Sequence, residues 1–361
     1  MKIISVVGAR PNFIKIAPLD KVLRQFPGRV EHLICHTGQH FDEKMSDIFF
    51  RELEMPKPTF NLGINSGSHA SQTGRIMMEF EKVLLEQKPD LVLVPGDVNS
   101  TLACSLTAVK LGIRVGHIES GLRSNDRSMP EEINRVVTDA VSDILFVSEE
   151  SGTTNLLREG VDKSKIHFVG NIMIDSLVFF MPRIEQSAIL ETMGLVAKQY
   201  LLVTFHRPGN VDSREFLASL IGFLNSLAKE RTVVFPVHPR TLNNINSFGL
   251  SGMLSENVMM INPVGYIEFL ALTRSAALVI TDSGGIQEET TFLKVPCLTV
   301  RENTERPVTI TLGTNELVGK DLDRCLARAA EILKNGHGKS EIPPFWDGHV
   351  AERIAEILLN H

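Results

Sequence analysis

Short apolar runs alternate with amphipathic segments along almost the whole chain. Each run is rich in Val, Ile and Leu and is bounded by polar residues or glycine, as is typical of a strand buried on both faces. The amphipathic segments repeat their apolar residues with the period of a helix. Strands that alternate with helices in this way predict an α/β protein with parallel sheets covered by helices.

The expected strands form two sets. The first is 2–7, 33–36, 91–95, 114–118, 144–147 and 166–169, and the second is 200–205, 233–237, 258–261, 278–281 and 297–300. Helical patterns separate them, for example 71–85, 100–110, 131–140, 214–227, 284–292 and 322–334. Two such sets predict two Rossmann-like domains, over residues 1–180 and 195–345. Pro182 is expected to interrupt the connecting helices 171–181 and 184–193, and helix 349–361 is expected to pack on the first domain.

Composition narrows the classes of function. The chain has 361 residues, 43% of them hydrophobic and 22% charged, with a net charge of −6, so we expect neither nucleic acid nor an anionic membrane as partner. No apolar run approaches the roughly 20 residues that span a bilayer. The four cysteines are far apart in apolar surroundings, which predicts free buried thiols and a cytoplasmic protein.

One run of residues predicts a nucleotide site. Thr281–Glu289 follows an apolar strand and continues into a helical pattern. Ser283, Gly284 and Gly285 are small where the backbone must approach a ligand, and the first N–H groups of a helix favour a phosphate. Glu289, about one turn further on, is placed to accept hydrogen bonds from ribose hydroxyls. The alternative is an ordinary capped helix.

Three carboxylates follow other elements of the first domain. Asp97 and Glu119 come after two expected strands, and Glu131 opens a helix behind Pro130. Asp97 also suits a helix N-cap, and Glu131 suits the first turn of a helix. If the three side chains converge, mutual repulsion and burial would separate acid from base roles.

Cationic residues follow strands as well. Arg10 and Lys15 follow the first strand and suit a pyrophosphate, with exposed surface charge as the alternative. His206 follows the first strand of the second domain and could equally be a buried, satisfied histidine. Arg306 lies after the last strand, where a surface turn is the alternative. We find no G-x-G-x-x-G fingerprint, Walker A loop or zinc-ligand spacing.

These motifs together resemble one family. They occur in the order Gly8-x-Arg10-Pro11…Lys15, Thr37-Gly38-Gln39-His40, Gly96-Asp97, His117-Ile118-Glu119-x-Gly121-Leu122-Arg123, Pro130-Glu131-Glu132-x-Asn134-Arg135, Thr204-x-His206-Arg207, Asp282–Glu289 and Thr304-Glu305-Arg306-Pro307. Each motif alone is weak, but eight in order are specific. The chain is similar, from end to end, to the non-hydrolysing UDP-N-acetylglucosamine 2-epimerases.

The resemblance implies a GT-B-like fold with the two sheets facing a central cleft, a homodimer, and reversible conversion of UDP-N-acetylglucosamine to UDP-N-acetylmannosamine through 2-acetamidoglucal. It implies no metal and no redox cofactor. The implied catalytic residues are Asp97, Glu119, Glu131 and His206. The implied contacts to the UDP-sugar are Arg10, Lys15, Phe269, Ser283, Gly284, Gly285, Glu289 and Arg306.

Some features depart from the pattern of the family. Pro208-Gly209-Asn210 replaces a segment in which many members carry a glutamate, and Ser71-Gln72 stands where regulated members have an Arg-Gln pair. Residues 41–50 and 66–75 are similar to a branch that acts on 2,3-diacetamido uronic-acid sugars. That substrate, a GT-B glycosyltransferase, the hydrolysing epimerase branch and a non-catalytic UDP-sugar sensor are therefore the alternatives.

Overall fold

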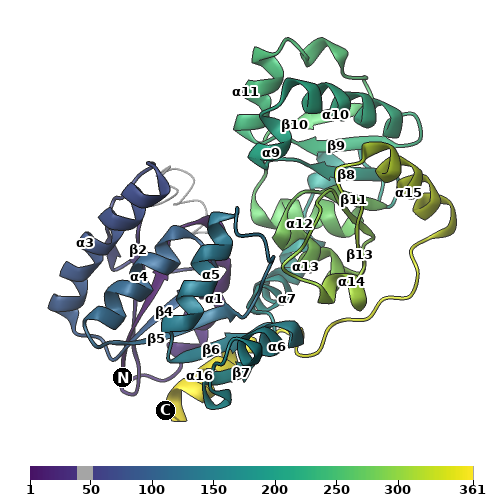
Figure 1. Cartoon of the computed structure of the whole chain (residues 1–361). Helices are drawn as coiled ribbons and strands as arrows, with labels where there is room; N and C mark the ends of the chain where they lie inside the picture. The colour runs from purple at the N-terminus through teal and green to yellow at the C-terminus, as the bar shows by residue number, and fades with distance from the viewer. Residues whose placement is uncertain (39–51, 361) are drawn as a thin grey trace. The chain divides into compact units, whose positions relative to one another are not determined.

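The computed structural model describes residues 1–38 and 52–360, without the side chains of Arg10 and Pro208. Gln39, His40 and segment 41–50, which entered the family comparison, lie outside the described residues. The chain divides into two compact units. Unit 1 is Met1–Phe179 with Pro344–His361, and unit 2 is Phe180–Pro343 (Figure 1).

Unit 1 is built on a parallel sheet of seven strands in the order β3-β2-β1-β4-β5-β6-β7. The strands are β1 Lys2–Val7, β2 Glu31–His36, β3 Phe60–Asn61, β4 Leu91–Pro95, β5 Arg114–Ser120, β6 Ile144–Val147 and β7 Ile166–Phe168. The strand order reverses between β1 and β4. Ligands of such sheets bind beyond the carboxyl ends of the strands at this switch point.

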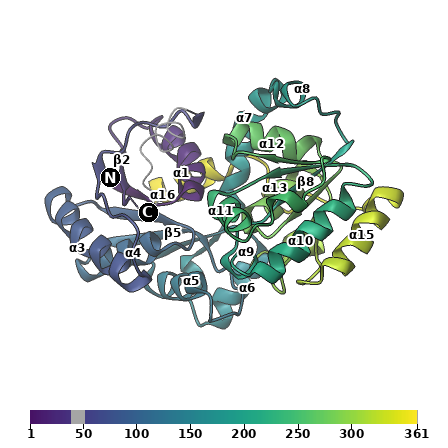
Figure 2. The ribbon, with the colours of Figure 1, turned by 90° about the horizontal axis from the view of Figure 1, so that it is seen from above.

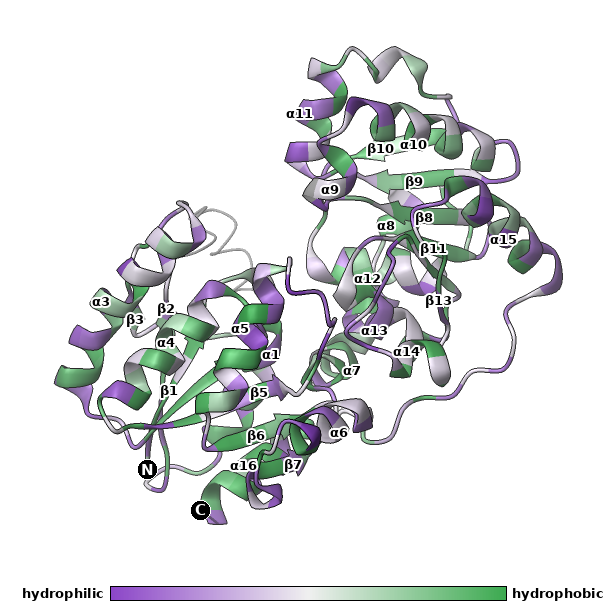
Figure 3. Cartoon of the chain, in the orientation of Figure 1, coloured by the Kyte–Doolittle hydropathy of each residue, from purple (hydrophilic) through white to green (hydrophobic). Residues whose placement is uncertain are grey.

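Helices cover this sheet. They are α1 Arg10–Leu23, α3 His69–Gln87, α4 Asn99–Lys110, α5 Pro130–Val141, α6 Glu150–Arg158, α7 Ile172–Glu185 and α16 Val350–Asn360. Aliphatic side chains of β1 and β4 pack with α3 and α4 in one continuous core. Figure 3 shows the strands as the most hydrophobic elements, because helices bury them on both faces.

The segment that follows unit 2 completes unit 1. Trp346 is 2% exposed, and its Nε1 donates to the Ser148 carbonyl over 3.0 Å. Helix α16 packs against α1 (Figure 2). Its first turn is capped by Asp175 of α7, which accepts from the Ala351 amide over 2.7 Å. Burial raises the pKa of Asp175 to about 7, although amides of α16 donate to it.

Unit 2 holds a parallel sheet of six strands in the order β10-β9-β8-β11-β12-β13. The strands are β8 Tyr200–Thr204, β9 Thr232–Pro236, β10 Val258–Ile261, β11 Leu278–Thr281, β12 Cys297–Thr299 and β13 Asn315–Leu317. The helices are α8 Ile189–Thr192, α9 Pro208–Val211, α10 Arg214–Leu227, α11 Pro239–Ser247, α12 Tyr266–Ser275, α13 Gly284–Leu293, α14 Val308–Thr311 and α15 Leu322–Asn335. Two cores lie on opposite faces of this sheet, and its order reverses between β8 and β11.

The predicted fold class, two α/β units with parallel sheets, is confirmed. Two expectations about elements are wrong. Helix α7 runs through Pro182 instead of breaking there, and β5 extends past the expected end at 118 to include Glu119. No helix among the described residues is long and apolar enough to cross a membrane.

Candidate active site

A buried ion pair lies at the switch point of the sheet in unit 1. Lys15, from the second turn of α1, pairs its Nζ with Oε2 of Glu119 at the end of β5. Both side chains are almost fully buried, at 6% and 5% exposure. The pair lies over Gly96, since a Cβ at that position would be 3.0 Å from Lys15 Nζ and 3.5 Å from Glu119 Oε2. Gly96 also has a φ of +68°, so glycine is favoured there for two independent reasons.

Glu119 is held in an unusual backbone conformation. Its φ is +72°, and the pairing of β5 with β6 shifts register between Ile118 and Ser120. Such a bulge re-aims a side chain at the edge of a sheet. A non-glycine residue with positive φ costs about 1–3 kcal/mol and persists only where its surroundings enforce it. The bulge therefore directs the Glu119 carboxylate toward Lys15.

Asp97 follows β4 and does not cap the next helix. The N-cap of α4 is Val98, and no side chain caps that end. Asp97 Oδ2 instead pairs with Arg135 Nη1 of α5 over 2.7 Å, and its side chain is 29% exposed. Asn134 Nδ2 donates to the Asp97 carbonyl over 2.8 Å. The capping interpretation of Asp97 is therefore wrong, and α5 holds this residue.

Glu131 and Glu132 differ in their surroundings. Glu132 accepts from the amides of Ser124 and Asn125 and pairs with Arg135, so it organises the preceding loop. Glu131 is half-buried and has no hydrogen bond or ion pair within the part of the chain that the structure describes. It lies one helical turn before Asn134 and Arg135, which hold Asp97, and residues at this spacing share a face. Glu131 thus belongs to the face of α5 that meets Asp97.

In unit 2, His206 and Asp282 form a dyad at the ends of neighbouring strands. Residues Thr204 of β8 and Thr281 of β11 are paired in the sheet, which brings the residues after them together. His206 Nδ1 lies 2.9 Å from Asp282 Oδ1, with the histidine side chain 45% exposed and the aspartate fully buried. The interpretation of His206 as a buried, satisfied histidine is therefore wrong.

Asp282 is a fixed anion. It accepts from the amides of His206 and Arg207 and from Asn210 Nδ2 over 3.0–3.2 Å. Burial alone would raise the pKa of Asp282, but the hydrogen bonds and the neighbouring His206 lower it overall. An ionised carboxylate on Nδ1 orients the ring and leaves Nε2 for a ligand.

Helix α13 begins directly after Asp282. Ser283 is its N-cap residue and makes no side-chain capping bond, so the ordinary capped helix is not what the structure shows. A Cβ at Gly285 would meet nothing within 4 Å, whereas one at Gly284 would lie 2.7 Å from Glu305 Oε1. Gly285 thus opens the space beside the helix N-terminus. Glu289, four residues on, shares its face and is buried.

Arg306 and Phe269 are less available than the family pattern implied. The Arg306 guanidinium is held between Glu288, 2.8 Å from Nε, and Glu305, 2.6 Å from Nη1, and it lies against Gly284. A surface turn is therefore wrong for Arg306. Phe269 of α12 packs partly into the core of unit 2. Arg10 begins α1, and its side chain lies outside the described part of the structure.

Several residues in these two groups were not singled out from the sequence. Arg135 and Asp282 stand inside recognised motifs, but no role was assigned to them. The usable signal for Asp282 was its position directly after a buried strand. No comparable signal marks Arg135, because its contact with Asp97 joins residues 38 positions apart.

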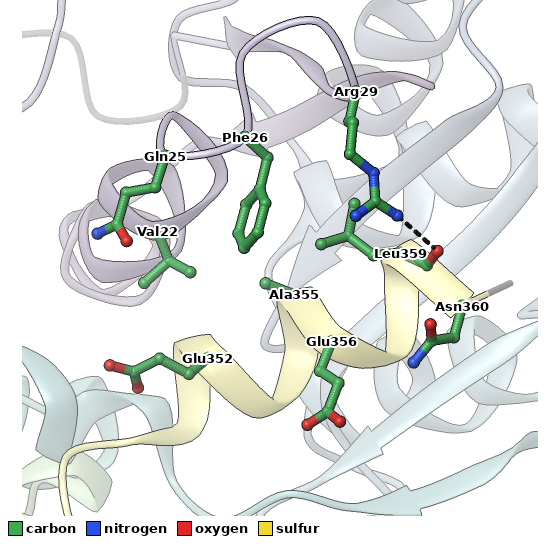
Figure 4. Close-up of a pocket in the computed structure, with 9 residues that line it drawn as sticks. All are labelled: Val22, Gln25, Phe26, Arg29, Glu352, Ala355, Glu356, Leu359 and Asn360. Carbon is green, nitrogen blue, oxygen red and sulfur yellow. Dashed lines mark hydrogen bonds between the residues drawn. The ribbon is translucent and has the colours of Figure 1, made fainter.

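A cavity of about 340 Å³ lies elsewhere in unit 1. Figure 4 shows it between the end of α1 and α16, lined by apolar Val22 and Phe26 and by Glu352 and Glu356. Arg29 bridges it by donating to the Leu359 carbonyl. None of the candidate site residues lines this cavity, and its carboxylates do not favour an anion.

The arrangement supports two kinds of chemistry. Unit 1 gathers carboxylates in different surroundings: Asp97 paired with an arginine, Glu119 buried with a lysine, and Glu131 half-buried. Such differences suit groups that take and return protons. Unit 2 offers a helix N-terminus and a half-exposed histidine, which suit the binding and release of a phosphate.

Comparisons with known proteins agree with this geometry. The family model described as UDP-N-acetylglucosamine 2-epimerase matches residues 23–359. A UDP-N-acetylglucosamine 2-epimerase of Methanococcus maripaludis is 46% identical over 99% of this chain and 98% of that protein. The UDP-2,3-diacetamido-2,3-dideoxy-D-glucuronate 2-epimerase of Pseudomonas aeruginosa is 42% identical over 99% of each chain.

A solved structure is similar throughout. The crystal structure of the Methanocaldococcus jannaschii UDP-GlcNAc 2-epimerase in complex with UDP-GlcNAc and UDP superposes with a TM-score of 0.92, at 43% identity and with complete coverage of both chains. The two parallel sheets of this chain match those of such GT-B-like enzymes. The chain therefore belongs to the UDP-N-acetylglucosamine 2-epimerase family and is an isomerase.

Proposed function

We propose that this protein interconverts UDP-N-acetylglucosamine and UDP-N-acetylmannosamine by eliminating UDP and adding it back through 2-acetamidoglucal, and that it works as a homodimer. The observation that carries the proposal is the group of Asp97, Glu119 and Glu131 around the switch point of unit 1. The similarity to the M. maripaludis and M. jannaschii epimerases supports it.

The proposed reaction conserves atoms and electrons. The C1–O bond breaks and its electron pair leaves with UDP, while a carboxylate takes the C2 proton and a C1–C2 double bond forms. A proton then returns to the opposite face of C2, and the UDP oxygen attacks C1. As C1 becomes positive, the C2 proton becomes acidic enough for a carboxylate, and an anionic group beside the ring stabilises the charge.

Each group of residues has a proposed part in this sequence. Asp97, Glu119 and Glu131 handle the proton and the positive charge on the sugar. His206, oriented by Asp282, and the N-terminus of α13 stabilise the diphosphate as it leaves and returns. Lys15 and Arg306, both held in ion pairs, set the charge around these two groups, and Glu289 takes the ribose.

A second candidate substrate is supported by a specific relative. The P. aeruginosa enzyme acts on a UDP-2,3-diacetamido uronic-acid sugar and is 42% identical over almost the whole length. Both substrates would pass through the same elimination at C1 and C2. They differ only in their substituents on the sugar.

Incubation in deuterated water tests the reaction. With UDP-N-acetylglucosamine, we expect NMR and mass spectrometry to show deuterium at C2 and the manno epimer as product, because the proton is removed and replaced from solvent. The diacetamido uronic-acid substrate is run in parallel, and the greater kcat/KM identifies the substrate. Failure of every UDP-sugar to exchange at C2 would overturn the proposal.

Replacing Gly285 by Ala tests the ligand-facing side of α13. A methyl group there meets no neighbour within 4 Å, so we expect the free energy of unfolding to stay unchanged or rise by up to about 1 kcal/mol. UDP binding, measured by calorimetry, should weaken because the methyl group fills the space beside the helix N-terminus. Gly284→Ala is the matched comparison and should lower stability, since its methyl group would strike Glu305. Unchanged UDP affinity in Gly285→Ala would contradict this placement.

A further inference from the structure

The imidazole of His117 lies entirely inside unit 1, at 0% exposure. It belongs to β5, two residues before Glu119. Its Nε2 lies 2.7 Å from the carbonyl oxygen of Gly96, and its Nδ1 lies 2.6 Å from Oδ1 of Asp139 on α5. Neither ring nitrogen faces solvent or a space for a ligand, so His117 cannot itself contact a substrate.

These contacts reach every element that carries one of the three carboxylates. Gly96 is the residue before Asp97, Glu119 is on the same strand as His117, and Asp139 is on the helix that Glu131 opens. Gly96 is held from both sides by β5, because its amide also donates to the Ile118 carbonyl over 2.9 Å. One side chain thus ties together β4, β5 and α5.

The hydrogen-bonding partners determine the protonation of this ring. A carbonyl oxygen can only accept, so Nε2 must donate to Gly96. Burial alone would raise the pKa of Asp139, but the neighbouring His117 and Arg123 lower it overall. Asp139 is therefore ionised and can only accept, so Nδ1 must donate as well. A histidine that donates from both nitrogens is an imidazolium.

The surrounding charges balance on the same assumption. Asp139 Oδ2 pairs with Arg123 over 2.7 Å and accepts from the Gly121 amide, and Arg123 also pairs with Glu159 over 2.7 Å. With an imidazolium at 117, the cluster has two cations and two anions. With a neutral ring it would keep one uncompensated negative charge in a buried place, which is costly.

We propose that His117 is a positioning residue of the epimerase: a buried imidazolium, bonded to Gly96 and Asp139, that fixes Asp97, Glu119 and Glu131 relative to one another. This inference rests on the proposed function. It predicts an effect on the chemical step, because displacement of reacting groups by about 1 Å can cost roughly 10²-fold in rate. It predicts no effect on the binding of UDP, whose proposed contacts are in unit 2.

The variant His117→Gln tests this role. Glutamine can donate to Gly96 or to Asp139 with its one amide nitrogen but cannot reproduce both bonds and the charge. We expect kcat for C2 deuterium exchange to fall roughly 10²-fold, with little change in KM and in the Kd for UDP. Loss of UDP affinity in step with kcat, or an unchanged kcat, would overturn the proposal.

His32 provides a matched control within the same unit. Its side chain is 2% exposed, with Nδ1 2.8 Å from Asp20 and Nε2 2.7 Å from Ser5. It contacts β1 and α1 instead of the carboxylate-bearing elements. His32→Gln should lower stability to a similar degree and leave kcat near that of the wild type. An equal loss of kcat in both variants would mean that general destabilisation explains the effect.

A spectroscopic measurement keeps the inference testable without a folded variant. In ¹⁵N-histidine-labelled wild-type protein at neutral pH, His117 should show protons on both ring nitrogens, and its signal should vanish in His117→Gln if that variant folds. A buried histidine with a single ring proton, found in place of this signal, would overturn the proposal. Wild-type protein that exchanges no UDP-sugar at C2 would instead refute the proposed function, since the NMR result does not depend on activity.

Discussion

Replacing Glu119 by Gln is expected to abolish nearly all turnover while UDP still binds. The amide keeps the shape of the side chain but cannot act as a base or stabilise positive charge, and general acid–base catalysis typically contributes roughly 10²–10⁴-fold. The variant should also be less stable, because the buried ammonium of Lys15 loses its carboxylate. Removing one partner of a buried ion pair costs about 3–5 kcal/mol. C2 exchange, UDP calorimetry and chemical denaturation measure the three effects.

A double variant separates the two losses. Lys15→Met with Glu119→Gln removes both charges of the pair, so the free energy of unfolding should recover toward the wild-type value. Turnover should remain lost, because the carboxylate is still absent. If turnover returned together with stability, Glu119 would be a structural residue only. If Glu119→Gln alone kept wild-type turnover, the proposed role of this carboxylate would be wrong.

Replacing Asp282 by Asn is expected to have the second large effect, on the opposite half of the chemistry. An amide at this position would turn its NH₂ group toward amides that now donate to the carboxylate, and it would no longer orient His206. We expect turnover to fall roughly 10²-fold or more and the free energy of unfolding to fall by about 1–3 kcal/mol. A full kinetic profile and urea denaturation check both.

Asp212 is the matched control for Asp282. It is an aspartate of the same unit whose side chain is 42% exposed and pairs with Arg240 at the surface. Exposed pairs contribute about 0–1 kcal/mol, so Asp212→Asn should leave both stability and turnover near the wild type. Equal effects of the two substitutions would contradict a specific role for Asp282.

The pH dependence of stability gives a further measure of the same carboxylate. The pKa of Asp282 in the folded protein lies below its ordinary value of 3.8. Its contribution to stability is therefore fully present above that value and is lost as pH falls through the lower, folded pKa. Asp282→Asn should lack this acid-labile part, so the difference in stability from the wild type should shrink in acid.

The alternation of apolar and amphipathic segments was enough to predict the two sheets. The bounds of β1, β4 and β6 match the apolar runs because these strands are buried on both faces. The short edge strands β3 and β13 were missed, since two or three residues carry no period. Pro182 misled because tertiary packing of the apolar residues of α7 outweighs one lost backbone hydrogen bond.

The candidate site was predictable as a set of residues but not as a set of contacts. Motif order pointed to Asp97, Glu119 and His206, because polar residues after strands are conspicuous. No local pattern indicates that Lys15 pairs with a residue 104 positions away, or that β5 bulges at Glu119. These contacts depend on strand order and register, which place distant residues together only after the sheet has formed.

The return of the chain to unit 1 has a consequence for protein synthesis. Unit 2 is one continuous segment, whereas unit 1 needs residues 344–361, which carry Trp346 and α16. A ribosome makes these residues only after all of unit 2 has been translated. Domains generally fold as units during synthesis, starting from the N-terminus, but here the first segment made must wait. Unit 2 can finish folding first, and the carboxylate-bearing half becomes complete only when α16 docks on α1.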